Sequence, residues 1–231
     1  MKRIVFSLLL MTAAFITKAQ TADEIITKHI EAIGGADAWK KVNSVKMEGT
    51  MQVQGATVTM TQTILHTKGN RQDISVMGMN GFTIIAPTSG WNFMPFNGQA
   101  APEALTPEDV AEAQADLDVQ GSLIDYAAKG HTVEYLGKDD VEGTDCFKLK
   151  INLKSGKSET YFFDAKSYLL IRSIAKQKAN GQEVEITTNF SNYEKLPEGI
   201  LVAKSVTLPF GEMNITKITI NGPVDETIFK N

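Results

Sequence analysis

The residues that most often carry out chemistry are sparse in this sequence and stand far apart. The three histidines are His29, His66 and His131, and none has a cysteine or a second histidine at the spacing of a metal site. Alternate acidic residues from Asp116 onward imitate the first half of a calcium loop, but the twelfth position is Ala127, where a bidentate Glu is required. We therefore expect no metal ligand and no cofactor.

Nucleophile and phosphate-binding motifs are also missing. The sequence has no Gly-x-Ser-x-Gly elbow, no Gly-Lys-Ser/Thr phosphate loop and no dinucleotide fingerprint. Glu183 and Glu185 share one face of a predicted strand, yet an acid–base pair would need an apolar cleft around one of them. Cys146 is the only cysteine, and we interpret it as a small packed side chain. These residue types do not predict an enzyme.

Alternating apolar and polar residues dominate the chain and predict a meander of antiparallel strands. In 184–190 the even-numbered residues are Val, Ile, Thr and Phe, while the odd-numbered ones are polar, which gives one apolar and one wet face. Turn residues at 164–167 and at Asn180-Gly181 separate this run from the strands before it. Similar runs give about eleven strands in a mainly β (α+β) fold. Besides the runs within 158–193, they lie at 44–54, 56–68, 71–79, 82–86, 91–96, 131–137, 144–153, 201–208 and 212–221.

The last of these runs changes its parity part of the way along. Met213 and Ile215 fall on one face of an ideal strand, whereas Ile218 and Ile220 fall on the other. One extra residue near Thr216-Lys217 would bring both pairs to the same side. The pattern therefore predicts a β-bulge or a twist at that point.

A helix is expected at the start of the mature chain. Thr21 is a suitable N-cap, acids follow in the first turn, and Gly34-Gly35 is a stop signal, which predicts a helix over 21–35. A short helix at 36–42 follows it. His29 lies within the apolar face, and we interpret it as a buried or half-buried side chain rather than a ligand.

A second helical region interrupts the strands. Thr106 as N-cap, Pro107 and two acids predict a helix to about residue 120. A break at Gly121-Ser122 and another helix at 123–129 complete the insertion. Its apolar face is weak, so we expect it to lie on the surface or to act as a cover.

The N-terminus has the pattern of a secretory signal peptide. Lys2 and Arg3 precede an apolar run at 4–16, shorter than the roughly 20 residues that span a bilayer, and small residues follow. We expect cleavage after Ala19, export to the periplasm and one domain at 20–231; a retained anchor and two small domains are the alternatives. No Cys follows the cleavage site, which excludes a lipid-modified N-terminus.

The net charge of the exported chain argues against some classes of binding partner. Cleavage would leave 20 basic and 27 acidic residues, a formal charge of −7. An acidic chain is a poor candidate for binding nucleic acid or an anionic membrane surface.

Methionine and aromatic residues concentrate between Val76 and Gln99. Such side chains supply adaptable apolar surface for irregular ligands, and they equally supply ordinary core. Both interpretations stay open. The residues are Met77, Met79, Phe82, Trp91, Phe93, Met94 and Phe96.

Three stretches of the chain resemble a known family. They are the helix ending in Gly-Gly at 22–35 (ADEIITKHIEAIGG), the hairpin at 161–172 (YFFDAKSYLLIR) and the closing segment at 220–229 (INGPVDETIF). The chain resembles the LolA/LolB-like periplasmic outer-membrane lipoprotein-sorting proteins, in the form common in Bacteroidetes, over essentially all of its mature length.

The resemblance implies a strongly curved antiparallel half-barrel, with the N-terminal helix and a helical lid at 104–129 covering its concave face. Such proteins hold acyl chains in an apolar cavity, and each buried methylene contributes about 0.8 kcal/mol without a directional partner. Arg71 would be a polar gate that anchors the lid or meets a headgroup; a merely exposed Arg is the alternative. The lining implied is Met60, Met77, Met79, Phe82, Trp91, Phe93, Met94, Phe96, Leu117, Phe163 and Phe190.

The function implied is that of a soluble, monomeric periplasmic carrier or binder. Its cargo would be lipoprotein acyl chains, phospholipid or fatty acid, and a sorting partner in the inner or outer membrane is part of this hypothesis. A protein-binding sensor or scaffold of the same fold without lipid cargo is the alternative, and an enzyme built on the fold is a third.

Overall fold

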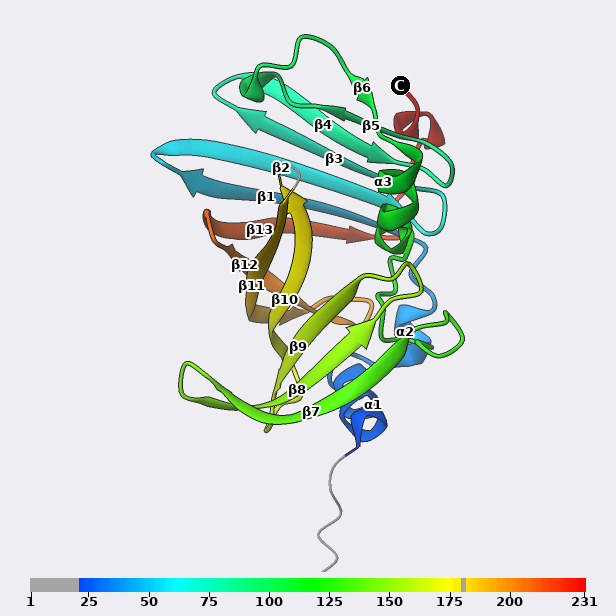
Figure 1. Cartoon of the computed structure of the whole chain (residues 1–231), viewed down its shortest axis with the longest axis vertical. Coiled ribbons are helices and arrows are strands. Elements are labelled where there is room, and N and C mark those ends of the chain that lie inside the picture. Colours follow the sequence, from blue (N-terminus) through cyan, green and yellow to red (C-terminus); the bar gives the residue numbers. More distant parts are fainter. Residues whose placement is uncertain (1–20, 180–181) are drawn as a thin grey trace, which may run out of the picture.

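One antiparallel sheet forms most of the structure, a computed structural model that describes residues 21–179 and 182–231 (Figure 1). The expected signal peptide at 1–19 and the Asn180-Gly181 turn lie outside the described residues. In the described part the strands are β1 Ser44–Val53, β2 Ala56–Leu65, β3 Gly69–Val76, β4 Met79–Ile85, β5 Gly90–Phe93, β6 Glu103–Ala104, β7 Thr132–Val141, β8 Thr144–Asn152, β9 Ser158–Asp164, β10 Leu170–Ala179, β11 Gln182–Lys195, β12 Leu201–Leu208 and β13 Gly211–Ile220.

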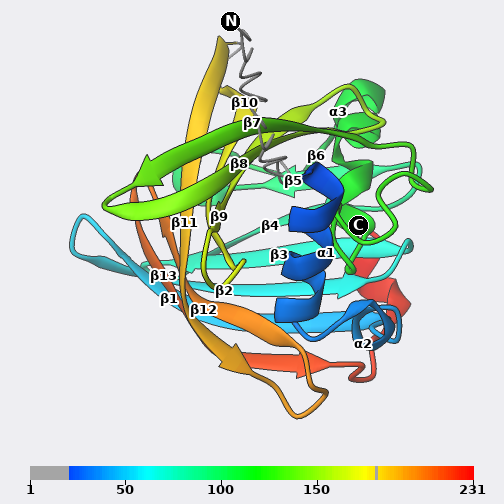
Figure 2. The same cartoon turned by 90° about the horizontal axis from the view of Figure 1, so that it is seen from below.

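The strand order explains how the sheet curves without closing. It runs β6-β5-β4-β3-β2-β1-β13-β12-β11-β10-β9-β8-β7, so β6 and β7 are the two edges. Seen from below, the strands wrap around helix α1 (Ala22–Ala32) in a half-barrel (Figure 2). The expected curved antiparallel half-barrel is confirmed. It has thirteen described strands rather than about eleven, in part because the two-residue β6 is too short to show alternation.

The predicted bulge in β13 is confirmed. Glu48 of β1 pairs with Lys217, but the next residue, Gly49, pairs with Ile215, which leaves Thr216 unpaired. The Thr216 hydroxyl donates to the Glu48 carbonyl over 3.0 Å. The extra residue restores the parity, so Met213 and Ile218 face the same side of the sheet.

The N-terminal helix forms as the sequence indicates. The Thr21 hydroxyl accepts from the Glu24 N–H, and the Glu24 carboxylate accepts from the Thr21 N–H, which makes a capping box. Helix α2 (Ala36–Trp39) follows after the Gly-Gly turn. α1 buries Ile25, Ile26 and His29 against the concave side of β8 and β9.

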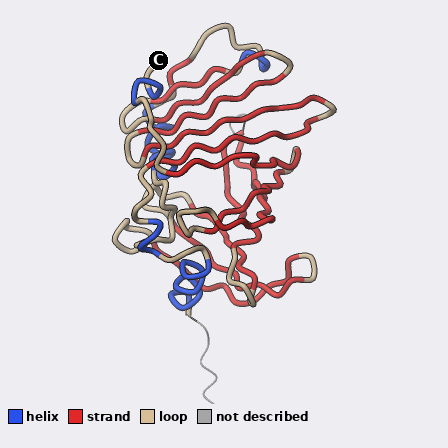
Figure 3. Tube along the Cα trace, turned by 180° about the vertical axis from the view of Figure 1, so that it is seen from behind, coloured by secondary structure: helices blue, strands red, loops and turns tan. Residues whose placement is uncertain are grey.

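The segment between β6 and β7 is less helical than expected. It contains α3 (Pro107–Glu112) and the 3₁₀ helix η2 (Ala113–Leu117), and the helix expected at 123–129 is wrong, because the chain makes turns there. Asp125 has a φ of 51°, which no α-helix accommodates. Packing of Leu123 and Ile124 into the core, 8% and 2% exposed, takes precedence over local helix propensity. The tube in Figure 3 shows this mostly irregular segment running beside the sheet.

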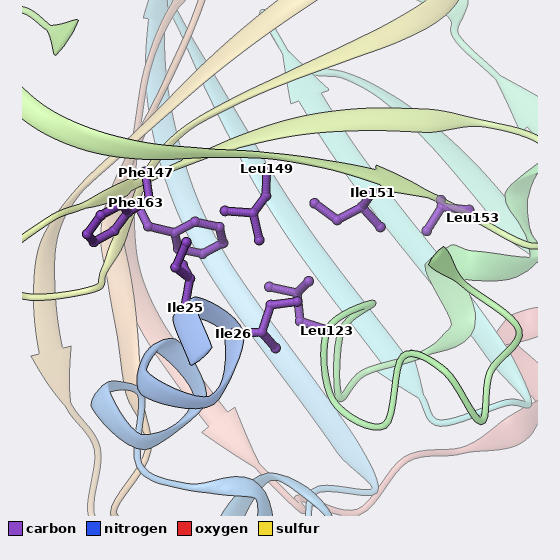
Figure 4. Close-up of a cluster of buried hydrophobic side chains, with 8 residues drawn as sticks. All are labelled: Ile25, Ile26, Leu123, Phe147, Leu149, Ile151, Leu153 and Phe163. Atoms are coloured by element: carbon purple, nitrogen blue, oxygen red, sulfur yellow. The ribbon is translucent and has the colours of Figure 1, made fainter. Parts of the chain in front are cut away.

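We call the segment between β6 and β7, residues 105–131, the lid segment. The main core lies between α1, this lid segment and the concave face of β8 and β9 (Figure 4). Side chains from the helix meet alternate residues of β8, so Ile25 and Ile26 face Leu149. Burial of such side chains is the dominant stabilising contribution to the fold. The buried members are Ile25, Ile26, Leu123, Phe147, Leu149, Ile151, Leu153 and Phe163.

A matched pair of substitutions on β8 tests this core. Leu149 is 0% exposed on the concave face, and its neighbour Lys150 points the other way. We expect Leu149→Ala to lower the free energy of unfolding by about 2–5 kcal/mol, and Lys150→Ala by roughly 0.5 kcal/mol or less, in urea titrations. Equal losses in the two variants would contradict this placement of the core.

His29 is buried and holds α1 to the sheet. Its Nδ1 donates to the Tyr168 carbonyl over 2.8 Å, and its ring lies 4.8 Å from that of Phe163. Burial lowers the pKa of His29 to about 4, against an ordinary value of 6.5. The side chain is therefore neutral in the folded protein, as its interpretation as a buried histidine requires.

The lowered pKa of His29 predicts a loss of stability in mild acid. An unfolded chain takes up a proton at His29 near pH 6.5, whereas the folded chain resists until about pH 4. Stability present above pH 6.5 is thus lost as the pH falls toward 4, by about 3 kcal/mol in total. Chemical unfolding at several pH values should show this slope, and His29→Leu should flatten it. An unchanged slope in the variant would rule out His29 as its source.

Candidate ligand-binding concavity

An apolar cluster occupies the concave face where the first and last strands meet. Paired residues share a face, and the pairs Met51–Val58, Val58–Val76 and Met51–Met213 connect its members across the sheet. Every member comes from a strand, and six of the nine keep part of their surface exposed. This apolar patch consists of Met51, Val53, Val58, Met60, Ile74, Val76, Val206, Met213 and Ile215.

A line of polar side chains crosses the same face beside the patch. Register pairs Gln62 of β2 with Gln72 of β3, Gln72 with Thr83 of β4, and Thr83 with Asn92 of β5. We call these four residues the polar row. The Thr83 hydroxyl donates to Asn92 Oδ1 over 3.0 Å, and Gln72 Nε2 lies 2.7 Å from Met60 Sδ, a weak acceptor.

Three members of the polar row, Gln62, Gln72 and Thr83, form one wall of a cavity of about 530 Å³. The opposite walls come from η2, the loop after it and β9, and an adjoining hollow of about 1070 Å³ shares several of the residues. This mixed lining differs from the apolar one that the family resemblance implies. The lining residues are Gln62, Ile64, Asn70, Gln72, Thr83, Ile85, Ala115, Asp116, Asp118, Ser122, Leu153, Glu159 and Tyr161.

The cavity has a negative character. Burial raises the pKa of Asp116, Lys157 opposes this rise, and Glu159 adds to it. Lys157 also lies 3.5 Å from a Glu112 oxygen, so its charge is shared between carboxylates. Lys129 Nζ lies 2.5 Å from Asp118 Oδ2, so the charge of Asp118 is balanced by an ion pair. Asp116 and Glu159 are therefore the two carboxylates of the cavity wall for which no ion pair closer than Lys157 is found among the described residues.

Hydrogen bonds hold η2 over the turn between β2 and β3. Asn70 Nδ2 donates to the Asp116 carbonyl over 3.2 Å, and the Thr67 N–H donates to the Leu117 carbonyl over 2.9 Å. Asn70 is only 9% exposed, and its carboxamide also accepts from Gln62 Nε2 at 3.2 Å. The lid segment is thus attached to the sheet at the edge of the cavity.

Several of the residues expected to line a lipid site do lie on the concave side. Met60 belongs to the patch, Met79 pairs with Val76, and Phe190 pairs with Val206. A Cβ built on Gly81 would lie 3.0 Å from the Phe96 ring and 3.1 Å from Met94 Sδ, so these two side chains cover Gly81. They are carried by η1 (Pro95–Asn97) and the residue before it.

The other expected residues do not line the open part of the concave face. Met77 is 81% exposed in the turn between β3 and β4, while Leu117 and Phe163 are buried in η2 and in the main core. Because Gly81 faces the concave side, Phe82 faces the convex side, and register puts Phe93 beside it. Trp91 pairs with Ile84, which lies two residues after Phe82 on the same face, so Trp91 also lies on the convex face.

Arg71 also lies on the convex face, two residues from Asp73. Its guanidinium bonds to the Asp73 carboxylate at 2.8 Å and to the Ile228 carbonyl at 3.0 Å, and it lies 4.9 Å from the Phe82 ring centre. These contacts hold the C-terminal 3₁₀ helix η3 (Glu226–Phe229) against β3. Nearby, the ring of Phe229 lies where a Cβ on Gly69 would be, which a side chain at position 69 would prevent.

The polar row and the carboxylates of Asp116 and Glu159 were not identified from the sequence. A signal for one of them existed, because Gln62 stands on the otherwise apolar face of its strand, beside Met60 and Ile64. The remaining members come together only through strand register and the fold of η2.

Groups with recognised chemistry are scarce in the part of the chain that the structure describes. No three His, Cys, Asp or Glu side chains there are grouped as a metal site would require. Cys146 is buried, and burial raises the pKa of its thiol to about 11, which fits a packed side chain. Among the described helices, none has the length and apolar character to cross a membrane.

Comparison with known proteins identifies the fold. No protein-family model and no curated protein matches the chain. A LolA superfamily protein from Nitrosomonas europaea superposes with a TM-score of 0.57 at 11% identity, over 92% of this chain and 99% of that one. A DUF1329 family protein from Desulfovibrio piger gives 0.55 at 15%, over 92% and 98%.

A third solved structure is a domain named as an outer membrane lipoprotein-sorting protein, from Vibrio parahaemolyticus. Its TM-score is 0.51 at 14% identity, over 89% of this chain and 94% of that one. The chain therefore has a LolA/LolB-like fold, as the sequence resemblance implies. At these identities the likeness concerns the fold.

Removing the Asn70 carboxamide tests the attachment of the lid segment. We expect Asn70→Ala to cost about 1 kcal/mol locally and to accelerate amide exchange in 113–118 roughly fivefold, measured by hydrogen–deuterium exchange. Asn152→Ala, which removes an exposed hydrogen bond from the end of β8 to Thr132 of β7, is the control and should leave 113–118 unchanged. Equal exchange in wild type and Asn70→Ala would show that Asn70 does not hold the segment.

Proposed function

We propose that this protein is a carrier or binder of acyl chains, held on the concave face of the half-barrel. The apolar patch is the observation that carries the proposal, because nine apolar side chains from five strands share one face and six stay partly exposed. Supporting it is the LolA/LolB-like fold, whose solved examples include a domain named for outer membrane lipoprotein sorting.

The physical chemistry of the patch suits a flexible hydrocarbon. Each methylene removed from water contributes about 0.8 kcal/mol and needs no directional partner. Met51, Met60 and Met213 are unbranched and polarisable, so they adjust to chains of different length and unsaturation. Catalytic residues are unnecessary for such binding.

We place the entrance at the turn between β3 and β4. Met77 and Met79 are 81% and 42% exposed and flank the end of β3, where Val76 belongs to the patch. Met94 and Phe96, which cover Gly81, lie beside this route, and Phe190 extends the apolar surface on β11. Phe82, Trp91 and Phe93 face away from it and would take part only through the convex surface.

The cellular setting belongs to the same proposal. Export to the periplasm through cleavage after Ala19 rests on the pattern of residues 1–19, and a role in outer-membrane lipoprotein sorting rests on the fold. A monomeric state and a sorting partner in either membrane follow from the same likeness. The cargo would be lipoprotein acyl chains, phospholipid or fatty acid.

Two neighbouring residues of β2 provide the test. Met60 faces the patch and Thr61 faces the convex side, so Met60→Asp and Thr61→Asp place the same charge on opposite faces. We expect Met60→Asp to weaken binding of a fluorescent fatty acid at least tenfold, because a carboxylate in an apolar site is costly. Thr61→Asp should bind as wild type does. Thermal unfolding of both variants verifies that each is folded.

Native mass spectrometry of the protein purified from periplasm without detergent gives a second readout. A bound mass matching a fatty acid or phospholipid, lost in Met60→Asp and kept in Thr61→Asp, is expected. A bare polypeptide mass together with no uptake of fluorescent fatty acid would refute the carrier proposal. A protein-binding sensor or scaffold of the same fold would then be the better description.

A further inference from the structure

The polar row interrupts an otherwise apolar face at a place where amides are poorly satisfied. Within the described chain, the Gln72 amide has one hydrogen-bond partner, the thioether of Met60, and the Gln62 amide donates only to Asn70. Both side chains keep part of their surface exposed, so their polar atoms can be reached from the cavity. Their carbonyl oxygens and remaining N–H groups face a cavity of about 530 Å³ and are available to a ligand.

Groups on the opposite walls add both kinds of hydrogen-bonding capacity. The hydroxyls of Ser122 and Tyr161 lie 3.2 Å apart at the cavity, and the carboxylates of Asp116 and Glu159 are acceptors there. Amides, hydroxyls and carboxylates together match a ligand whose groups both donate and accept. Sugar hydroxyls have this property.

The charge of the cavity favours a sugar headgroup over the phosphate of common membrane lipids. Asp116 and Glu159 face the cavity itself, whereas the adjoining hollow carries both signs of charge, with Asp109, Glu112, Lys157 and Lys176 in its lining. A phosphate would meet like charge at short range in a partly desolvated site, which is unfavourable. A neutral headgroup meets no such penalty.

From these observations we propose that the cavity binds a neutral, hydroxyl-rich headgroup, such as the sugar of a glycolipid, while the apolar patch holds its acyl chains. This inference rests on the proposed function and specifies the class of cargo. The geometry allows both contacts at once, because Met60 stands two residues from Gln62 and Ile74 two residues from Gln72 on the same face. Two residues along a strand span about 6.6 Å.

The test compares lipids that share their tails. Displacement of a fluorescent fatty acid from the full mature chain would be measured with dioctanoylglycerol, its monoglucosyl derivative and dioctanoyl phosphatidylglycerol. We expect the glucosyl lipid to bind about tenfold more tightly than the diacylglycerol, the gain of one or two net hydrogen bonds. Phosphatidylglycerol should bind more weakly than either.

Variants then test which side chain causes the preference for the glucosyl lipid. Gln72→Met keeps the side-chain length but removes the amide, and we expect it to reduce the tenfold ratio between glucosyl lipid and diacylglycerol to about twofold or less. Thr61→Val, on the convex face of β2, is the matched control and should keep the wild-type ratio. Unfolding midpoints of both variants verify that a lost ratio does not reflect a lost fold.

Three other results of the lipid-binding experiment would contradict the proposal, each for a different reason. Equal affinity for glucosyl lipid and diacylglycerol, with both bound, would overturn the headgroup site and leave acyl-chain binding intact. Tighter binding of a trimethylammonium lipid than of the glucosyl lipid would show that the carboxylates, rather than the polar row, select the headgroup. Failure of the protein to bind the fluorescent fatty acid and every one of the lipids would overturn the proposed function itself.

Discussion

Strict alternation of side chains along hydrogen-bonded strands is the constraint on which the other features depend. One residue of slip would exchange the concave and convex faces of a strand. The bulge at Thr216 keeps Met213 on the same face as Ile218, and so keeps the apolar patch continuous from β13 to β1. The patch, the polar row and the position of the cavity all follow from this single register.

The main core and the proposed binding surface are located in different parts of the same concave face. α1 and the lid segment fill the face of β8 and β9, where Leu149 and Phe163 are 0% exposed. The face of β1–β3, β12 and β13 has no comparable helix in its cluster, and Met60 and Ile74 stay partly exposed. A well-packed half can therefore support a half that remains open to a ligand. The polar row lies between them, which explains why the cavity is less apolar than the fold family suggests.

The sequence predicts the features that depend on residues close to one another along the chain. The strands, the N-cap at Thr21 and the change of parity near Thr216 are visible as local patterns, and each is found in the structure. The helix expected at 123–129 is missing because burial of Ile124 outweighs local propensity. The face on which Phe82 lies, and the approach of Asp116 to the polar row, depend on pairings between distant strands, which one sequence does not reveal.

The pairing of β1 with β13 also affects how the chain reaches its fold. Val45 pairs with Ile220, near the two ends of the described chain, so the centre of the sheet closes only when the last strand is present. Contacts of such long sequence separation slow folding, because a large loop must close first. Until then β1 keeps one edge unpaired and able to join other strands. A chain released before its final strand would thus expose the middle of its sheet.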